Sequence, residues 1–424
     1  MSSRISLLAG FLIVLPSLLS AENWADWRGS NGNGGSDEAK PPVEWSETKN
    51  VKWKVAIPGV GSGSPVVWED RVFVVTAVGE DGGRGFDGQK ASEVTFKIFC
   101  FDRETGKVKW EKTAVKAVPH EGTHSSNGFA SASPCTDGTH VYAHFGSRGL
   151  YCYTMEGELV WKRDDFGKMK TRGSFGEGSS PALHGEVIIV PWDHEGPSAL
   201  WTLNALTGKT IWKIERDEPS AWSTPYVVKS GEQELVIMNG EKSIRAYDLK
   251  SGDEVWRYAG ISTRPIATAV SRDGLVFVGG GRKSRFFGAF KLDGKGDLKG
   301  TESLVWSWTK NIPDIPSPVL SGELLYFLKN KSGSLSCVDS ATGKAHYTAK
   351  RLPKISSVYA SPITAGGHVY VTGRSGAIVV LKDGKEFEIV ASNSVGEGVD
   401  ATPAAVDQQL FIRGASHLFC IEKE

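Results

Sequence analysis

A short hairpin signature recurs along this chain and strongly limits the folds that the chain can adopt. The clearest copy is Asp102-Arg-Glu-Thr-Gly106-Lys-Val-Lys-Trp110. Related copies span residues 204–212, 248–256 and 339–347, and shortened forms span 156–161 and 383–387, the last ending in Phe387. The Asp or Asn side chain can accept hydrogen bonds from backbone amides of the turn, and Gly supplies the positive φ. The aromatic residue then returns in register to pack between neighbouring units.

A second repeated feature marks the start of each unit: a small residue, or in one unit Arg, is followed by Pro. The eight prolines are Pro65, Pro134, Pro181, Pro225, Pro265, Pro318, Pro362 and Pro403. Their mean spacing of about 48 residues is typical of four-stranded propeller blades.

The first unit shows the strand pattern that the others repeat. Runs rich in Val, Ile and Phe at 64–68, 72–77, 96–102 and 108–112 alternate with Gly- and Asp-rich turns, which predicts four antiparallel strands. The last unit provides only three such runs before the chain ends. We expect residues 50–55 near the N-terminus to supply the missing strand and close the ring. The sequence therefore predicts an all-β, eight-bladed propeller over 50–424, with seven blades as the alternative count.

The opening prolines and the Asp-x-x-Thr-Gly-Lys-x-x-Trp hairpins resemble the tryptophan-docking repeats of the quinoprotein dehydrogenases. They equally resemble non-enzymatic relatives that carry the same pyrroloquinoline-quinone-like repeats, such as the scaffold propeller of outer-membrane assembly. The resemblance covers about residues 50–424. It implies the propeller fold, and it leaves the choice between an enzyme and a binding protein open.

The first 21 residues have the character of a secretory signal peptide. Arg4 precedes the mostly apolar run 5–15, and small residues lead to a cleavage site after Ala21. The run is shorter than the roughly 20 residues that span a bilayer, so a membrane anchor is the less favoured alternative. We expect a soluble periplasmic or secreted protein with no membrane span. Residues 22–49 are predicted to form an N-terminal arm that packs on the propeller.

Charge and cysteine usage narrow the choice of partners and cofactors. The chain carries 49 basic and 49 acidic residues, so it has no net field to attract nucleic acid.

Four of the five cysteines fall in the same repeated position, two residues before the turn: Cys100, Cys152, Cys337 and Cys420. Equivalent positions in different blades lie beyond the ~7 Å Cα separation that a disulfide allows. We therefore expect buried, unpaired cysteines.

In such a propeller the longer loops share one face, which we predict to be the binding face. Residues near the start of each unit should border the mouth of the central channel. Five of them combine aromatic and charged side chains that suit a planar anion such as a quinone cofactor, although a water-filled polar channel is the alternative. These candidates are Glu177, Trp222, Arg264, Tyr359 and Asp400.

Histidines in the long loops give no metal-binding pattern. His120 and His124 have a spacing that suits zinc only on a helix, and Gly122 argues against a helix there. His194 lies between Asp193 and Glu195, and neighbouring residues of an extended segment point in opposite directions. We expect no metal site at these positions.

Two functions are consistent with these features. The first is a binding or scaffold platform that recognises an envelope or extracellular protein or glycan through its loop-rich face. The second is a quinoprotein dehydrogenase that oxidises an alcohol or sugar with pyrroloquinoline quinone and calcium. Catalytic members of the resembling family carry adjacent cysteines and a calcium site of Glu, Asn and Asp. This chain has no adjacent cysteines, and its sequence spacing identifies no such trio.

Overall fold

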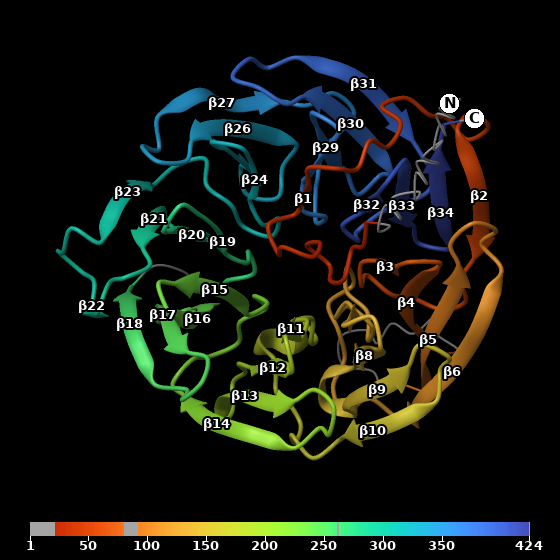
Figure 1. Ribbon diagram of the computed structural model, residues 1–424, viewed down its shortest axis with the longest axis horizontal. Coiled ribbons are helices and arrows are strands. Elements are labelled where there is room, and N and C mark those ends of the chain that lie inside the picture. Colours follow the sequence, from red (N-terminus) through yellow and green to blue (C-terminus); the bar gives the residue numbers. More distant parts are fainter. Residues whose placement is uncertain (1–21, 80–91, 261–262, 424) are drawn as a thin grey trace, which may run out of the picture.

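Eight antiparallel sheets stand around a central axis in this protein (Figure 1). The computed structural model describes residues 22–79, 92–260 and 263–423. Each sheet contains the four antiparallel strands of one blade, and the chain visits the blades in sequence order around the ring. The eight-bladed propeller predicted from the sequence is therefore confirmed.

Within each blade the strands follow one another from the axis outward. Blade 1 contains β3 (Val66–Trp68), β4 (Arg71–Val78), β5 (Val94–Asp102) and β6 (Val108–Ala117); blade 2 contains β7 (Cys135–Thr136), β8 (His140–His144), β9 (Leu150–Thr154) and β10 (Leu159–Arg163). Blade 3 contains β11 (Ala182–His184), β12 (Val187–Trp192), β13 (Ser198–Asn204) and β14 (Thr210–Arg216); blade 4 contains β15 (Tyr226–Ser230), β16 (Gln233–Asn239), β17 (Ser243–Asp248) and β18 (Glu254–Ala259).

The second half of the ring repeats this order. Blade 5 contains β19 (Val270–Arg272), β20 (Leu275–Gly279), β21 (Phe287–Lys291) and β23 (Leu304–Trp308); blade 6 contains β24 (Val319–Ser321), β25 (Leu324–Leu328), β26 (Ser334–Asp339) and β27 (Ala345–Arg351). Blade 7 contains β28 (Ile363–Ala365), β29 (His368–Thr372), β30 (Ala377–Lys382) and β31 (Ile389–Ser394); blade 8 contains β32 (Ala404–Val406), β33 (Gln409–Arg413), β34 (His417–Glu422) and β2 (Val51–Ala56). Two short strands, β1 (Gly35–Ser36) and β22 (Gly296–Asp297), add to the edges of blades 7 and 4.

The two ends of the chain meet in blade 8. Strand β2 pairs antiparallel with β34, and Trp53 lies opposite Cys420. This pairing confirms that an N-terminal strand completes the last blade. It also covers an edge that would otherwise offer unpaired backbone groups to other chains.

In five blades the tryptophan of the hairpin connects its blade to the next one. Five indoles donate their Nε1–H to a backbone carbonyl of the following blade at 2.8–2.9 Å: Trp53, Trp110, Trp161, Trp212 and Trp306. Each of these rings lies against the hairpin glycine of that blade, namely Gly106, Gly157, Gly208, Gly252 and Gly343. These glycines have φ between 68° and 86°. A side chain there would therefore be strained and would also meet the indole.

Two blades depart from the predicted repeat. In blade 7 the residue opposite Val380 is Ala391, so Phe387 does not occupy the docking position. Phe387 instead packs against Tyr347 of blade 6, with ring centroids 5.4 Å apart. In blade 5 the small residue that begins the blade is Thr268, which is followed by Ala269. Pro265 lies three residues earlier, and its carbonyl accepts a hydrogen bond from the backbone N–H of Trp222 at 2.8 Å.

A closed circle of hydrogen bonds surrounds the central channel. In every blade one buried Ser or Thr donates its backbone N–H to the side-chain hydroxyl of the equivalent residue in the next blade, at 2.9–3.3 Å. The eight residues are Ser64, Ser133, Ser180, Thr224, Thr268, Ser317, Ser361 and Thr402. The last bond runs from Thr402 back to Ser64, so the circle is complete. We call these eight residues the hydroxyl ring.

The cysteines take the places that the repeat assigns to them. All five are buried and free. Cys100, Cys152 and Cys420 lie directly opposite Trp110, Trp161 and Trp53, and Cys337 lies opposite Tyr347. Burial raises the pKa of the Cys100, Cys152 and Cys337 thiols to about 12, which leaves them protonated and unreactive at neutral pH.

Within 22–79, 92–260 and 263–423, none of the helices has the length and apolar character needed to cross a membrane.

Removing one hydroxyl from the ring should destabilise the whole propeller. Ser317 is 1% exposed, and its Oγ accepts the backbone N–H of Thr268 at 2.9 Å. In the variant Ser317→Ala that buried N–H loses its acceptor, which costs about 1–3 kcal/mol. We expect a lower urea midpoint for Ser317→Ala, with recovery in Ser317→Thr and no change for Ser416→Ala at an exposed loop. Equal midpoints for all four proteins would contradict the role of the ring.

Candidate functional site

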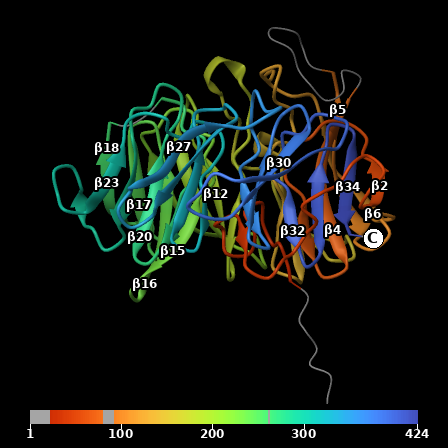
Figure 2. The same ribbon diagram turned by 90° about the horizontal axis from the view of Figure 1, so that it is seen from above.

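The N-terminal arm closes one end of the central channel. It crosses the middle of the ring (Figure 1) and lies at the face that carries the β15–β16 turn (Figure 2). Trp24 exchanges backbone hydrogen bonds with Val67 of blade 1, and β1 pairs in parallel with β28 of blade 7. The arm predicted from the sequence therefore packs across several blades before it enters blade 8 as β2.

Arg28 anchors the arm to two blades at once. Its guanidinium donates to the carbonyl of Pro362 at 3.0 Å and to the carbonyl of Pro318. Burial lowers the pKa of Arg28 to about 10, and burial raises the pKa of the nearby Asp26 carboxyl to about 6. The residue between them, Trp27, faces the channel and lines its closed end.

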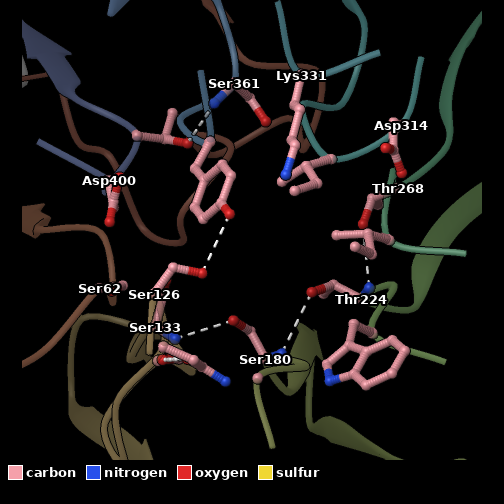
Figure 3. Close-up of a pocket in the computed structure, with 18 of the residues that line it drawn as sticks. Ser62, Ser126, Ser133, Ser180, Thr224, Thr268, Asp314, Lys331, Ser361 and Asp400 are labelled. Carbon is pink, nitrogen blue, oxygen red and sulfur yellow. Dashed lines mark hydrogen bonds between the residues drawn. The ribbon is translucent and has the colours of Figure 1, made fainter. Parts of the chain in front are cut away.

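Above this closed end the channel widens into a cavity of about 520 Å³ (Figure 3). Seven of the eight residues of the hydroxyl ring line it: Ser64, Ser133, Ser180, Thr224, Thr268, Ser361 and Thr402. A second row of side chains lies two residues before the ring in each blade: Ser62, Ser131, Gly178, Trp222, Ile266, Ile315, Tyr359 and Asp400. Loops of the opposite face complete the wall. The cavity is thus closed by the arm and bordered by loops, which makes it a candidate ligand site.

Aromatic rings and a cation form one side of the cavity. Trp222 donates its Nε1–H to the carbonyl of Gly176 at 2.7 Å and packs against Phe175 at 6.4 Å between centroids. The guanidinium of Arg264 lies 5.2 Å from the Phe175 centroid. Burial, and then the neighbouring charge of Arg282, lower the pKa of Arg264. This side therefore combines a flat apolar surface with positive charge.

Tyr359 forms an aromatic surface in another part of the wall. Its hydroxyl is 3.1 Å from the Oγ of Ser126, and the Arg374 guanidinium lies 4.0 Å from its ring centroid. Arg374 binds Asp400 through two hydrogen bonds of 2.6 and 3.0 Å. The carboxylate of Asp400 is therefore neutralised by a cation of the protein itself.

Positive charge exceeds negative charge in the rest of the lining. Arg264, Arg282 and Lys331 all line the cavity, and Asp314 is the acidic residue among them. Burial raises the pKa of Asp314, although all three cations act to lower it. In Figure 3 Lys331 reaches into the cavity from the side opposite Ser133 and Ser180. Three cations facing one carboxylate give a site that favours an anionic ligand.

The structure brings four of the five predicted site residues together. Trp222, Arg264, Tyr359 and Asp400 line the cavity, whereas Glu177 does not. The Glu177 carboxylate accepts hydrogen bonds from the backbone and side chain of Ser147 and from Arg148. The cause is the register of the extended segment. The residue that faces the channel there is Gly178, and the side chain of the preceding residue points in the opposite direction. The ligand-binding role of the other four remains a prediction.

None of Phe175, Arg282, Asp314 and Lys331 was assigned to this site from the sequence. The common signal is positional, since all four lie in loops that join strands at one end of the blades. Of the three histidines considered for metal binding, His124 lines the cavity and its Nδ1 lies 2.7 Å from Ser126 Oγ, whereas the other two make structural contacts. His120 Nε2 lies 2.6 Å from the carbonyl oxygen of Met169, and His194 Nδ1 accepts the N–H of Lys170.

The residues present fit an anion and do not fit a calcium ion. Across 22–79, 92–260 and 263–423, no cluster of three or more His, Cys, Asp or Glu side chains is placed to hold a metal. Both carboxylate oxygens of Asp400 and of Glu177 already accept hydrogen bonds from protein groups. Calcium takes six to eight oxygen ligands. A planar anionic quinone matches the size, aromatic rings and positive charge of the cavity, but its usual metal partner has no donor set here.

Comparison with known proteins assigns the family. A family model described as outer membrane protein assembly factor BamB matches residues 94–349. The chain belongs to this family of pyrroloquinoline-quinone-like propellers. Propellers of this kind are also found among the solved structures. The BamB structure from Moraxella catarrhalis has a TM-score of 0.57 and 12% sequence identity, covering 88% of this chain and 96% of that one.

Relatives with an enzymatic name match as well. The quinohemoprotein alcohol dehydrogenase from Comamonas testosteroni has a TM-score of 0.64 and 13% identity, covering 94% of this chain and 80% of that one. In sequence, subunit 1 of methanol dehydrogenase from Methylorubrum extorquens is 38% identical over 91 residues. That match covers 19% of this chain and only 13% of the dehydrogenase subunit. Structural likeness at these identities establishes the fold of this propeller and leaves its activity to be tested.

The partly buried carboxyl of Asp26 makes a pH-dependent contribution to stability. The pKa of Asp26 is about 6 in the folded protein against 3.8 for an unperturbed carboxyl. Between these pH values the folded state binds more protons than the unfolded state, so stability falls as pH rises through this window. In Asp26→Asn we expect stability to be unchanged near pH 4 and higher by about 2–3 kcal/mol at pH 7.5. Parallel pH profiles of the melting temperature for the two proteins would contradict this.

Proposed function

We propose that this protein is an exported binding platform that takes an anionic group of its partner into the cavity at the centre of its loop face. The observation that carries the proposal is the set of cations Arg264, Arg282 and Lys331 facing one acidic residue in a cavity of about 520 Å³. Small-molecule sites typically have volumes of roughly 300–1,000 Å³ and a few converging polar groups. The partner would be an envelope or extracellular protein or glycan.

Export is proposed on the sequence of residues 1–21, which lie outside the described residues. Their basic start, apolar run and small-residue ending are typical of a signal peptide. A periplasmic or secreted location would bring the loop face into contact with envelope or extracellular molecules.

The second candidate function is a quinoprotein dehydrogenase acting on an alcohol or sugar. It is favoured by the 38% identity over 91 residues with a methanol dehydrogenase subunit and by the aromatic, cationic lining of the cavity. When bound, the quinone would supply the electron-accepting chemistry. In this chain Lys331, Arg264 and Trp222 would hold and orient it. The carboxylates of Asp400 and Glu177 are already bound by protein groups, and this favours the platform.

Binding of an anionic fluorescent dye tests the proposal that the cavity is a site for an anionic ligand. Anilinonaphthalene sulfonate combines aromatic rings with one negative charge, so it should bind the native protein at a single site. We expect Lys331→Met and Arg282→Gln each to weaken dye binding about tenfold, because each removes a charge-assisted contact. Lys250→Gln, which removes an exposed cation at a turn of the opposite face, serves as the matched control. Equal dissociation constants in all four proteins would refute a cationic ligand site in the cavity.

The dehydrogenase alternative predicts a different result. Pyrroloquinoline quinone with calcium would raise the melting temperature of the purified protein and start dye-linked oxidation of an alcohol or sugar. The platform predicts no turnover with any of these substrates, and no additional stabilisation from calcium over quinone alone. Turnover that requires the quinone would establish the alternative instead.

A further inference from the structure

The cavity combines three kinds of lining group: aromatic surfaces, hydroxyl groups and an excess of cations over carboxylates. We infer that its ligand is an acidic sugar at the end of a glycan chain, one that carries a carboxylate or sulfate. This inference rests on the proposed function and names the ligand class of that same site. Four features of the described residues carry it.

Aromatic faces are available to the sugar ring. The Trp222 indole is fixed by its bond to Gly176 and by its contact with Phe175, and Tyr359 presents a second ring from another part of the wall. Rigid aromatic side chains provide large contact areas with little loss of conformational freedom. They suit the apolar C–H faces of a pyranose ring as well as a flat aromatic ligand.

The hydroxyl ring favours a sugar over a flat quinone. Each hydroxyl in the ring accepts one backbone N–H, and it still carries its own O–H and a second lone pair. Seven such groups line the cavity, so the site offers both donors and acceptors along its inner end. A sugar has hydroxyls that can use both kinds of partner, whereas a quinone tricarboxylate offers mainly acceptors. The inner end of the cavity therefore matches a polyhydroxylated ligand.

The excess cations require that this sugar be acidic. Asp400 is already bound by Arg374, so Asp314 is the acidic residue of the lining that faces Arg264, Arg282 and Lys331. Glu241, which does not line the cavity, also acts on Arg264 but is bound to Arg172. A carboxylate or sulfate would form charge-assisted hydrogen bonds with these side chains. Arg264 is held at a φ of 56°, in the left-handed region, by a hydrogen bond from its backbone N–H to Glu241 at 3.1 Å.

The arm determines which part of a glycan can enter. Trp27 lines the closed end of the cavity, and Arg28 ties the arm to blades 6 and 7. A polymer cannot pass through a channel that is closed at one end. The site therefore accepts a chain end, and one polymer should bind few protein molecules however long it is.

Calorimetry with three matched trisaccharides tests the inference. The probes are trigalacturonate, a sulfated galactotriose and neutral galactotriose, which share their ring geometry and differ in charge. We expect at least one acidic probe to bind about tenfold or more tightly than the neutral one, with the difference abolished by Lys331→Met or Arg282→Gln and retained in Lys250→Gln. The two acidic probes distinguish a carboxylate from a sulfate. With the acidic polymer of the better probe, the number of proteins bound per chain should stay constant as chain length increases.

Each of four outcomes would overturn the inference. Neutral and acidic trisaccharides of equal affinity would refute the charge requirement, and protein bound in proportion to polymer length would refute recognition of chain ends. Failure of both acidic probes, while the naphthalene sulfonate dye still depends on Lys331 and Arg282, would reject the sugar and keep the proposed function. Loss of that dye dependence would reject both.

Discussion

The circle of eight hydrogen bonds around the channel is the constraint on which both the ring and the cavity depend. Each bond joins a backbone N–H of one blade to a hydroxyl of the next, and the bond from Thr402 to Ser64 joins the last blade to the first. Because all eight residues are buried, an amide left without its partner would be costly. The circle thus sets the spacing of the innermost strands. It also fixes where the residues two positions upstream enter the channel.

The indole contacts form a second circle at a larger radius. The two circles differ in how far they tolerate a blade that departs from the repeat. The outer circle is interrupted where Ala391 takes the docking position and where the longer hairpin of blade 5 packs Leu298 near Trp256. In the inner circle the hydroxyl is kept even in blade 5, where Ala269 replaces the proline. A backbone amide needs an acceptor at one place, whereas an apolar contact can be supplied by several arrangements of side chains.

These differences explain what the sequence could and could not predict. Blade number, closure by β2 and the position of the free cysteines follow from local repeats, and all of them were confirmed. The opening of blade 5 was misplaced at Pro265, because the hydroxyl and not the proline is the required feature. Glu177 was misplaced by one residue, which in an extended segment is enough to turn a carboxylate away from the channel. Lys331 and Asp314 come from different loops, and no local spacing connects them to Arg264.

The same construction that makes the ring rigid also leaves its centre chemically adaptable. The hydroxyl ring uses only one lone pair of each side chain, so the inner end of the cavity remains polar whatever the loops contribute. Charge is added by single residues on those loops, such as Lys331 and Arg282, which can change without disturbing a strand. A relative with an acidic set at these positions could coordinate a metal, whereas this chain offers cations. In this chain the charge of the loop residues, and not the propeller framework, therefore makes the cavity suited to an anionic ligand.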